Sequence, residues 1–195
     1  MKYLSISAPL LAIAAFTTPA SAALQAGTPA PLFTAQASLN GKSFSYSLKD
    51  ALKKGTVVVY FYPSAYTQGC DLQAHTFATR IEDFTAAGAT VVGVSLDSID
   101  RLNEFSADPD FCAGKFPTAS DATGSIAKSF DLAVHDARPD VKDVHGKPLD
   151  HGFAERTTFI ITPNGKVHET IGGVSPTENV QHSLETIQAL AHAQR

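Results

Sequence analysis

Two uninterrupted apolar runs separated by an amphipathic stretch constrain the fold of this chain more than any other feature. The runs are residues 56–61 (TVVVYF) and 90–95 (TVVGVS). Neither shows the polar alternation of a half-exposed strand, so we expect both to be strands covered on both faces. Between them, residues 68–88 carry an apolar stripe at helical spacing and end at Gly88, which is typical of a helix terminus. The pattern predicts a strand–helix–strand unit within a larger sheet.

The remaining sequence adds two hairpins and three helical stretches to this unit. Asn40-Gly41 between two alternating segments predicts a hairpin near the N-terminus, and residues 157–171 predict another across Pro163-Asn164-Gly165. Helical patterns cover residues 98–113, interrupted at Asp108-Pro109, and residues 125–130 and 176–193, with a short strand at 116–119. Residues 133–152 lose all periodicity and read as a long surface loop. The order predicts an α/β fold, with one mixed central sheet flanked by helices.

Composition places the chain among ordinary globular proteins. It has 195 residues, of which 44% are apolar and 17% charged, so it can bury a core without disulfides or metal. The formal net charge is −4 and no segment is dense in Lys or Arg. This distribution argues against nucleic-acid binding, which needs a basic surface.

The N-terminus predicts export. Lys2 is the only charged residue before Lys42, and residues 4–16 are apolar but too short to span a bilayer. Ala20-Ser21-Ala22 matches the small-residue pattern of a signal-peptide cleavage site. We therefore expect a signal peptide at 1–22, a mature domain at 23–195, and a periplasmic or secreted location without membrane attachment. Such compartments are oxidising, so a cysteine pair can form and keep a disulfide there.

Cys70, one of two cysteines, is the strongest candidate for chemistry. It is predicted to lie in the first turn of the helix that follows the first buried strand, where free N–H groups and the helix dipole favour a thiolate. An unperturbed thiol is roughly 3% ionised at pH 7, so complete ionisation increases the population of nucleophilic thiolate by at most about 30-fold. Larger acceleration requires hydrogen-bond donors around the sulfur. Thr67 is a candidate for this role, and Pro63 can shield the other side.

The motif Pro63-x-x-x-Thr67-x-x-Cys70 after the VVVYFYP strand resembles the active site of peroxiredoxins in the AhpC/TSA superfamily. The likeness is to the peroxiredoxin Q, or bacterioferritin-comigratory, branch, and it implies a thioredoxin-like fold. It further implies that Pro63 limits solvent, that Thr67 hydrogen-bonds the peroxide, and that Cys70 attacks the O–O bond to form a sulfenic acid. Arg156 matches a family arginine that holds thiolate and peroxide together.

This resemblance runs from about Gly27 to the C-terminal helix, with two departures near Cys70. Gln68 stands where the branch usually has Pro, and His75 stands where many members have a second cysteine. Cys112 resembles the resolving cysteine that a subset of this branch carries on the following helix, although this sequence has extra residues at 106–109 that shift its alignment with the branch. Three readings of Cys112 remain open: catalytic disulfide partner, permanent structural disulfide, or unpaired core residue.

Each site residue also has a plainer reading. Cys70 alone fits a buried inert thiol, Thr67 a helix cap, and Arg156 a surface partner of Glu155 or Asp150. Only the whole constellation favours an enzyme.

The resemblance implies a thiol peroxidase that acts on hydrogen peroxide and organic hydroperoxides without haem, flavin or metal. It implies resolution of Cys70 by Cys112, an external dithiol reductant such as a thioredoxin-like protein, and a monomer or weak dimer. One alternative is an exported thiol-disulfide oxidoreductase, although the chain lacks Cys-x-x-Cys. Another is a metal carrier that uses the cysteines or His135, His145 and His151, which lack a tight ligand spacing.

Overall fold

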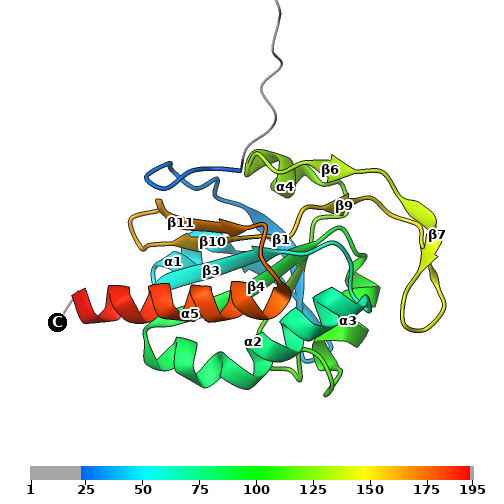
Figure 1. Ribbon diagram of the computed structural model, residues 1–195, viewed down its shortest axis with the longest axis horizontal. Coiled ribbons are helices and arrows are strands. Elements are labelled where there is room, and N and C mark those ends of the chain that lie inside the picture. The colour runs from blue at the N-terminus through cyan, green and yellow to red at the C-terminus, as the bar shows by residue number, and fades with distance from the viewer. Residues whose placement is uncertain (1–22, 194–195) are drawn as a thin grey trace, which may run out of the picture.

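A seven-stranded mixed sheet forms the centre of the protein (Figure 1). A computed structural model describes residues 23–193, so the predicted signal peptide lies outside the described residues. The strands are β1 (Thr34–Leu39), β2 (Lys42–Ser47), β3 (Thr56–Phe61), β4 (Ala89–Ser95), β5 (Thr118–Ser120), β10 (Thr157–Ile161) and β11 (Val167–Gly172). Their order is β11-β10-β3-β4-β5-β1-β2, in which β3, β4 and β5 are parallel and the other pairs are antiparallel. The predicted mixed sheet is confirmed.

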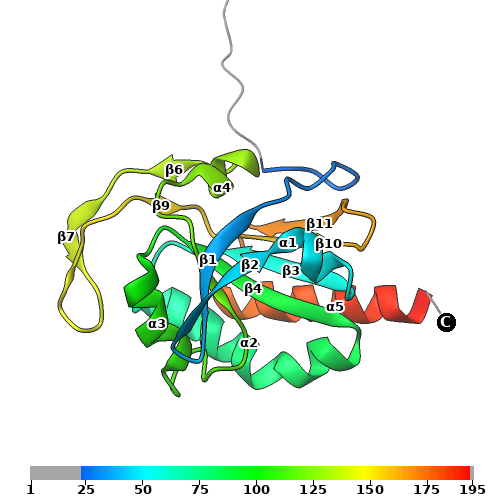
Figure 2. The same cartoon turned by 180° about the vertical axis from the view of Figure 1, so that it is seen from behind.

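Helices cover both faces of this sheet. Helices α2 (Gln68–Ala86), α3 (Ile99–Ala107) and α5 (Pro176–Ala193) pack on one face, and α1 (Leu48–Leu52) and α4 (Ser125–Ser129) lie on the other (Figures 1 and 2). Strand β3 is buried along its whole length. Val58 and Tyr60 join the core beneath α2, whereas Val57 and Val59 join the core on the opposite face. Alternation along a strand explains this division, and the prediction of a strand covered on both sides is confirmed.

The N-terminal hairpin follows its predicted turn. Asn40 and Gly41 have φ values of 50° and 75°, which is the left-handed pair that a two-residue hairpin requires. Helix α1 was not predicted, because its five residues are too few to show a helical period. Its start is fixed by Ser47, whose side chain accepts a hydrogen bond from the N–H of Asp50 at 3.2 Å.

Two sequence-based expectations are wrong in detail. Helix α3 ends at Ala107 rather than near residue 113, because Asp108 is extended (φ −62°, ψ 120°) before Pro109, as a residue preceding proline tends to be. Cys112 therefore lies in a turn and not on a helix.

Residues 133–152 are also not a structureless loop. They form β6 (Val134–His135), which pairs with β9 (Phe153–Ala154), and a hairpin of β7 (Arg138–Lys142) and β8 (Pro148–Leu149). We call residues 133–154 the excursion; it extends from one end of the molecule beside α3 (Figures 1 and 2). Strands β6, β8 and β9 have two residues each and leave no periodic signal, and the five residues of β7 are almost all exposed and show no apolar alternation.

Gly93 on β4 permits the close approach of Tyr60 from β3, with which it pairs. A Cβ atom at Gly93 would lie 2.8 Å from both Cζ and the hydroxyl oxygen of Tyr60. The Tyr60 ring cannot retreat easily, since it stacks on Phe77 with ring centroids 4.6 Å apart and on Tyr62 at 5.3 Å.

We therefore predict that Gly93→Ala destabilises the protein by about 1–3 kcal/mol, the usual cost of overpacking a core. Urea denaturation measures this loss as a lower midpoint. Thr90→Ser, at an exposed position of the same strand, serves as the control and is expected to change stability by no more than about 0.5 kcal/mol. Equal stability of Gly93→Ala and the wild type would contradict the packing argument.

Candidate active site

Cys70 lies in the first turn of α2 and is only 2% exposed. Its N–H donates to the carbonyl of Thr67 at 2.8 Å. Thr67 occupies the N-cap position, yet its side chain makes no cap hydrogen bond and donates instead to the carbonyl of Ser64 at 2.8 Å. Because its only proton is used in this way, the Thr67 hydroxyl can meet a ligand as a hydrogen-bond acceptor.

Arg156 reaches Cys70 because of the register between β10 and β3. Thr157, the first residue of β10, lies opposite Phe61, the last residue of β3, so Arg156 lies where the chain leaves β3 toward the helix. Its Nη2 donates to Cys70 Sγ at 3.3 Å. Gly69 keeps space for the guanidinium, since a Cβ there would lie 3.2 Å from Nη2. The structure thus brings together the predicted thiol and the predicted cation.

A buried polar chain behind Arg156 fixes its orientation, and sequence reasoning missed it. Arg156 Nη1 donates to Gln73 Oε1. Gln73 Nε2 donates to Asn179 Oδ1 at 2.9 Å, and the same oxygen accepts from Thr158 at 2.6 Å. Gln73, Asn179 and Thr158 are at most 1% exposed. Buried polar groups that satisfy one another hold a rigid geometry, so the guanidinium is presented to the sulfur in one orientation.

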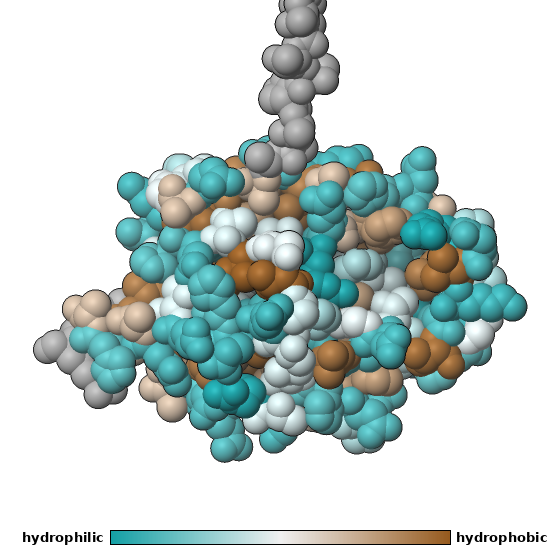
Figure 3. All heavy atoms as spheres, in the orientation of Figure 1, coloured by the Kyte–Doolittle hydropathy of each residue, from teal (hydrophilic) through white to brown (hydrophobic). Residues whose placement is uncertain are grey.

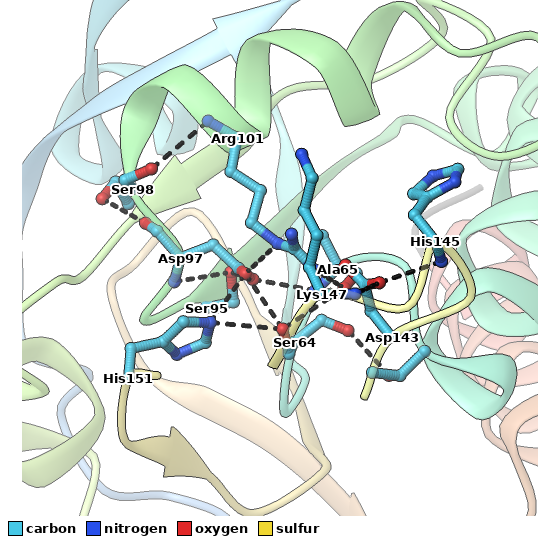
Figure 4. A network of polar contacts seen from close by, with 12 residues as sticks. Ser64, Ala65, Ser95, Asp97, Ser98, Arg101, Asp143, His145, Lys147 and His151 are labelled. Atoms are coloured by element: carbon cyan, nitrogen blue, oxygen red, sulfur yellow. Dashed lines mark hydrogen bonds and ion pairs between the residues drawn. The ribbon is translucent and has the colours of Figure 1, made fainter. Parts of the chain in front are cut away.

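Pro63 lies in the loop between β3 and α2 and is half-buried. The shielding of the sulfur by Pro63 stays a prediction. The next residues are bound to Asp97, a wholly buried carboxylate just after β4 (Figure 4). Asp97 accepts from Ser64 Oγ at 3.0 Å and from the N–H of Ala65 at 2.8 Å. This carboxylate therefore anchors the loop that leads to Cys70.

The excursion holds the same loop from the other side. The N–H of Val144 donates to the carbonyl of Tyr66 at 2.9 Å, and Tyr66 has the left-handed φ of 59°. Arg101 on α3 joins the two parts, because it forms ion pairs with Asp97 (2.9 Å) and with Asp143 of the excursion (2.7 Å). We call Ser64, Ala65, Asp97, Arg101, Asp143 and His151 the loop clamp (Figure 4).

His151 completes the loop clamp as a cation. Its Nδ1 lies 2.7 Å from the carbonyl of Gly152 and its Nε2 lies 2.9 Å from Asp97 Oδ1. Both ring nitrogens face acceptors, so the imidazolium satisfies more contacts than the neutral ring. Burial lowers the pKa of His151, but the hydrogen bond and the charge of Asp97 outweigh burial and raise it overall. Burial likewise raises the pKa of Asp97, and the contacts with His151 and Ser95 bring it below its usual value.

Cys112 is fully buried in the turn after α3 and belongs to the same core cluster as Cys70. Both thiols are free. Burial raises the pKa of Cys112 well above its ordinary value, and the charges of Asp108 and Asp71 raise it further. The thiol is therefore neutral at physiological pH.

The histidines of the excursion take part in separate contacts. His135 lies 3.7 Å from Glu155, His145 packs against the Tyr66 ring at 4.6 Å, and His151 belongs to the loop clamp. Within residues 23–193 no three His, Cys, Asp or Glu side chains gather as a metal site would need. The same part of the chain contains no helix with the length and apolar character needed to cross a bilayer.

Comparison with known proteins identifies clear relatives. Residues 26–170 match the AhpC/TSA family. The chloroplast 2-Cys peroxiredoxin BAS1 of Hordeum vulgare is 30% identical over 174 residues, covering 87% of this chain and 76% of that protein. The structure of peroxidoxin BcpB from Mycobacterium tuberculosis superposes with a TM-score of 0.69 at 26% identity, covering 86% of this chain and 98% of that one.

A bacterioferritin comigratory protein from Xanthomonas campestris, described for its alkyl peroxide reduction activity, is also similar. It has a TM-score of 0.63 and 29% identity, and the match covers 80% of this chain and 91% of that one. These likenesses confirm the thioredoxin-like α/β fold expected from the sequence.

The raised pKa of His151 predicts a pH-dependent stability. The stabilisation from its protonated form is complete below about pH 6.5, the unfolded value, and is lost as pH rises through the higher folded value. Between pH 6 and 9 the wild type is expected to lose roughly 1 kcal/mol more than His151→Asn. Urea denaturation at each pH measures the difference. His168→Asn, at an exposed site on β11, is the control and should show the wild-type dependence of stability on pH. If the free energy of unfolding of the wild type and of His151→Asn changed equally with pH, the prediction would be contradicted.

Proposed function

The chain belongs to the AhpC/TSA family of peroxiredoxins, and from this premise we propose that Cys70 is the peroxidatic thiol of a thiol-dependent peroxidase. Thiol peroxidase activity is the property that its relatives share. The observation that carries the assignment to Cys70 is its contact with Arg156, 3.3 Å away at a helix N-terminus. A cation in contact with the sulfur at the start of a helix favours the thiolate, which is the reactive form.

In the first step the Cys70 thiolate attacks one oxygen of the peroxide. An S–O bond forms while the O–O bond breaks, and the second oxygen leaves as water or an alcohol after it takes a proton. The sulfur is oxidised to a sulfenic acid and the peroxide is reduced. Arg156 stabilises negative charge on the sulfur and on the departing oxygen, and Thr67 accepts a hydrogen bond from the peroxide O–H. Gln73 and Asn179 keep the guanidinium in place.

We propose that Cys112 resolves the sulfenic acid. Its sulfur attacks Cys70, a disulfide forms, and the hydroxyl of the sulfenic acid leaves as water with the thiol proton. Cys70 is held in the first turn of α2 and Cys112 in a separate turn after α3. Because a disulfide needs a specific geometry, with Cα atoms within about 7 Å, we expect the first turn of α2 to open before the bond forms. A thioredoxin-type dithiol then reduces the disulfide.

The substrate is a peroxide, and we propose that both hydrogen peroxide and organic hydroperoxides are accepted. Alkyl peroxide reduction by the Xanthomonas campestris relative supports the second class. We also propose that residues 1–22 direct export to the periplasm or the medium, on the strength of the Ala20-Ser21-Ala22 pattern.

A monomer or weak dimer is the assembly we propose. On the face shown in Figure 3, hydrophobic residues lie in small separate patches, so this face does not offer the larger apolar area that a stable dimer needs.

We predict that Cys70→Ser abolishes peroxide consumption in the presence of dithiothreitol. Arg156→Lys keeps the charge but loses the forked contact with Gln73 and the sulfur, so its rate should fall on the order of 100-fold. Thr67→Val should lower the rate by about tenfold, since one hydrogen bond to the peroxide is lost. Arg138→Lys on exposed β7 is the control and should leave the rate unchanged. Full activity in Thr67→Val and Arg156→Lys would contradict their roles.

Intact-mass spectrometry tests the resolving step. One equivalent of hydrogen peroxide should lower the mass of the wild type by about 2 Da, whereas Cys112→Ser should gain about 16 Da as a stable sulfenic acid. A wild-type chain that gains mass instead would show a one-cysteine mechanism. Applied to protein from its native host, the same measurement shows whether the chain starts at Ala23, and light scattering of that sample gives the mass of the assembly.

A further inference from the structure

Asp71 is a buried carboxyl group that the proposed chemistry does not use. It follows Cys70 in the first turn of α2 and is 7% exposed. Its Oδ1 is buried and has no hydrogen-bond partner among residues 23–193. An unsatisfied buried oxygen destabilises the folded state and calls for an explanation. Asp71 lies in the turn that we expect to open during disulfide formation, so we ask whether its carboxyl group affects that opening.

The groups around Asp71 leave its charge poorly compensated. Burial raises the pKa of Asp71 to about 7, and the charge of Asp108 also raises it. Hydrogen bonds from the N–H groups of Tyr66 and Thr67 and the charge of Arg101 lower this pKa, but they offset the effect of burial only in part. Arg101 is already engaged with two other carboxylates. Cys112 is a further titratable neighbour, and the charge of Asp71 raises its pKa.

The turn and the Cys112 segment lie against each other. His75, on the next turn of α2, has its Nδ1 3.0 Å from the carbonyl of Asp110. Cys112 follows two residues later and shares a core cluster with Cys70. Movement of the first turn therefore takes place directly beside the second thiol.

Ionisation of a buried carboxyl favours any state in which water reaches it. A carboxyl in water has a pKa of about 3.9, and in the closed turn Asp71 has a higher value. By linkage, the closed turn loses stability relative to the open turn as pH rises from about 4 to about 7, and the effect levels off above that. The opening equilibrium should increase by up to about tenfold per pH unit within this window.

We propose that Asp71 is a positioning residue for the resolution step, because its carboxylate favours the open first turn of α2 in which Cys70 leaves its pocket and meets Cys112. The proposal rests on the resolving role proposed for Cys112. The Asp71 carboxylate has an unpartnered oxygen in the closed turn, whereas water hydrates it in the open turn. This difference favours the open turn when Asp71 is ionised. It adds no reactant to the disulfide step.

Hydrogen exchange of the reduced full chain tests the coupling without peroxide. Amides of residues 68–73 are followed by mass spectrometry at pH 5, 6, 7 and 8, with correction for chemical exchange. Wild-type opening should rise by up to about tenfold per unit from pH 5 to 7 and then level off, whereas Asp71→Asn should show less than about a twofold change over the whole range. Glu82→Gln, which removes an exposed carboxylate from the same helix, should behave as the wild type.

A purely structural role would change protection by the same factor at every pH, because it involves no proton. The same rise in Asp71→Asn as in the wild type, or a wild-type profile that does not change from pH 5 to 7, would overturn the proposal.

A second measurement follows disulfide formation after one equivalent of peroxide. At pH 7 Asp71→Asn should form the disulfide at least about tenfold more slowly than the wild type, while the sulfenic acid, heavier by about 16 Da, accumulates. A wild-type rate in Asp71→Asn would overturn the role of Asp71. A wild-type chain that never loses about 2 Da would instead contradict the role of Cys112 as the resolving thiol. The hydrogen-exchange experiment tests the role of Asp71 independently of that result.

Discussion

The donation from Arg156 to the sulfur of Cys70 is the interaction on which the rest of this site depends. It joins the start of α2 to the start of β10, and it exists only because β10 pairs with β3 in a register that places Thr157 beside Phe61. A one-residue slip would turn every side chain of β10 to the opposite face. The buried β3 strand thus determines both the core and the distance between the thiol and its cation.

Local patterns predicted most of the fold, because its main elements are long or carry distinctive turns. The apolar β3 and β4, the amphipathic α2 and the Asn40-Gly41 turn each have a period or a turn residue that sequence alone reveals. Helix α1 and the short strands of the excursion have neither. Their positions depend on contacts between distant residues, such as the ion pair of Arg101 with Asp143, which no window of sequence can show.

The residues of the candidate site likewise fall into those that the sequence predicts and those that only the fold reveals. Cys70, Thr67 and Arg156 follow from a motif and its family resemblance, and the structure places Arg156 against the sulfur. Gln73 and Asn179 could not be found, since they lie on two helices that meet only in the folded chain. Asp97 offered a signal, because an acidic residue directly after a buried strand is unusual and requires partners. Its partner His151 belongs to the segment for which the sequence predicts a surface loop, whereas the excursion brings it to a buried carboxylate.

The loop clamp has a consequence for turnover. Ser64, Ala65 and Tyr66 are each bound to groups outside α2, so a rearrangement that unwinds the helix start need not disturb the residues just before it. Thr67 is the boundary between the two parts. The three residues before Thr67 can therefore keep their positions if the first turn of α2 opens as proposed, so the helix start can refold against a loop that is already in place.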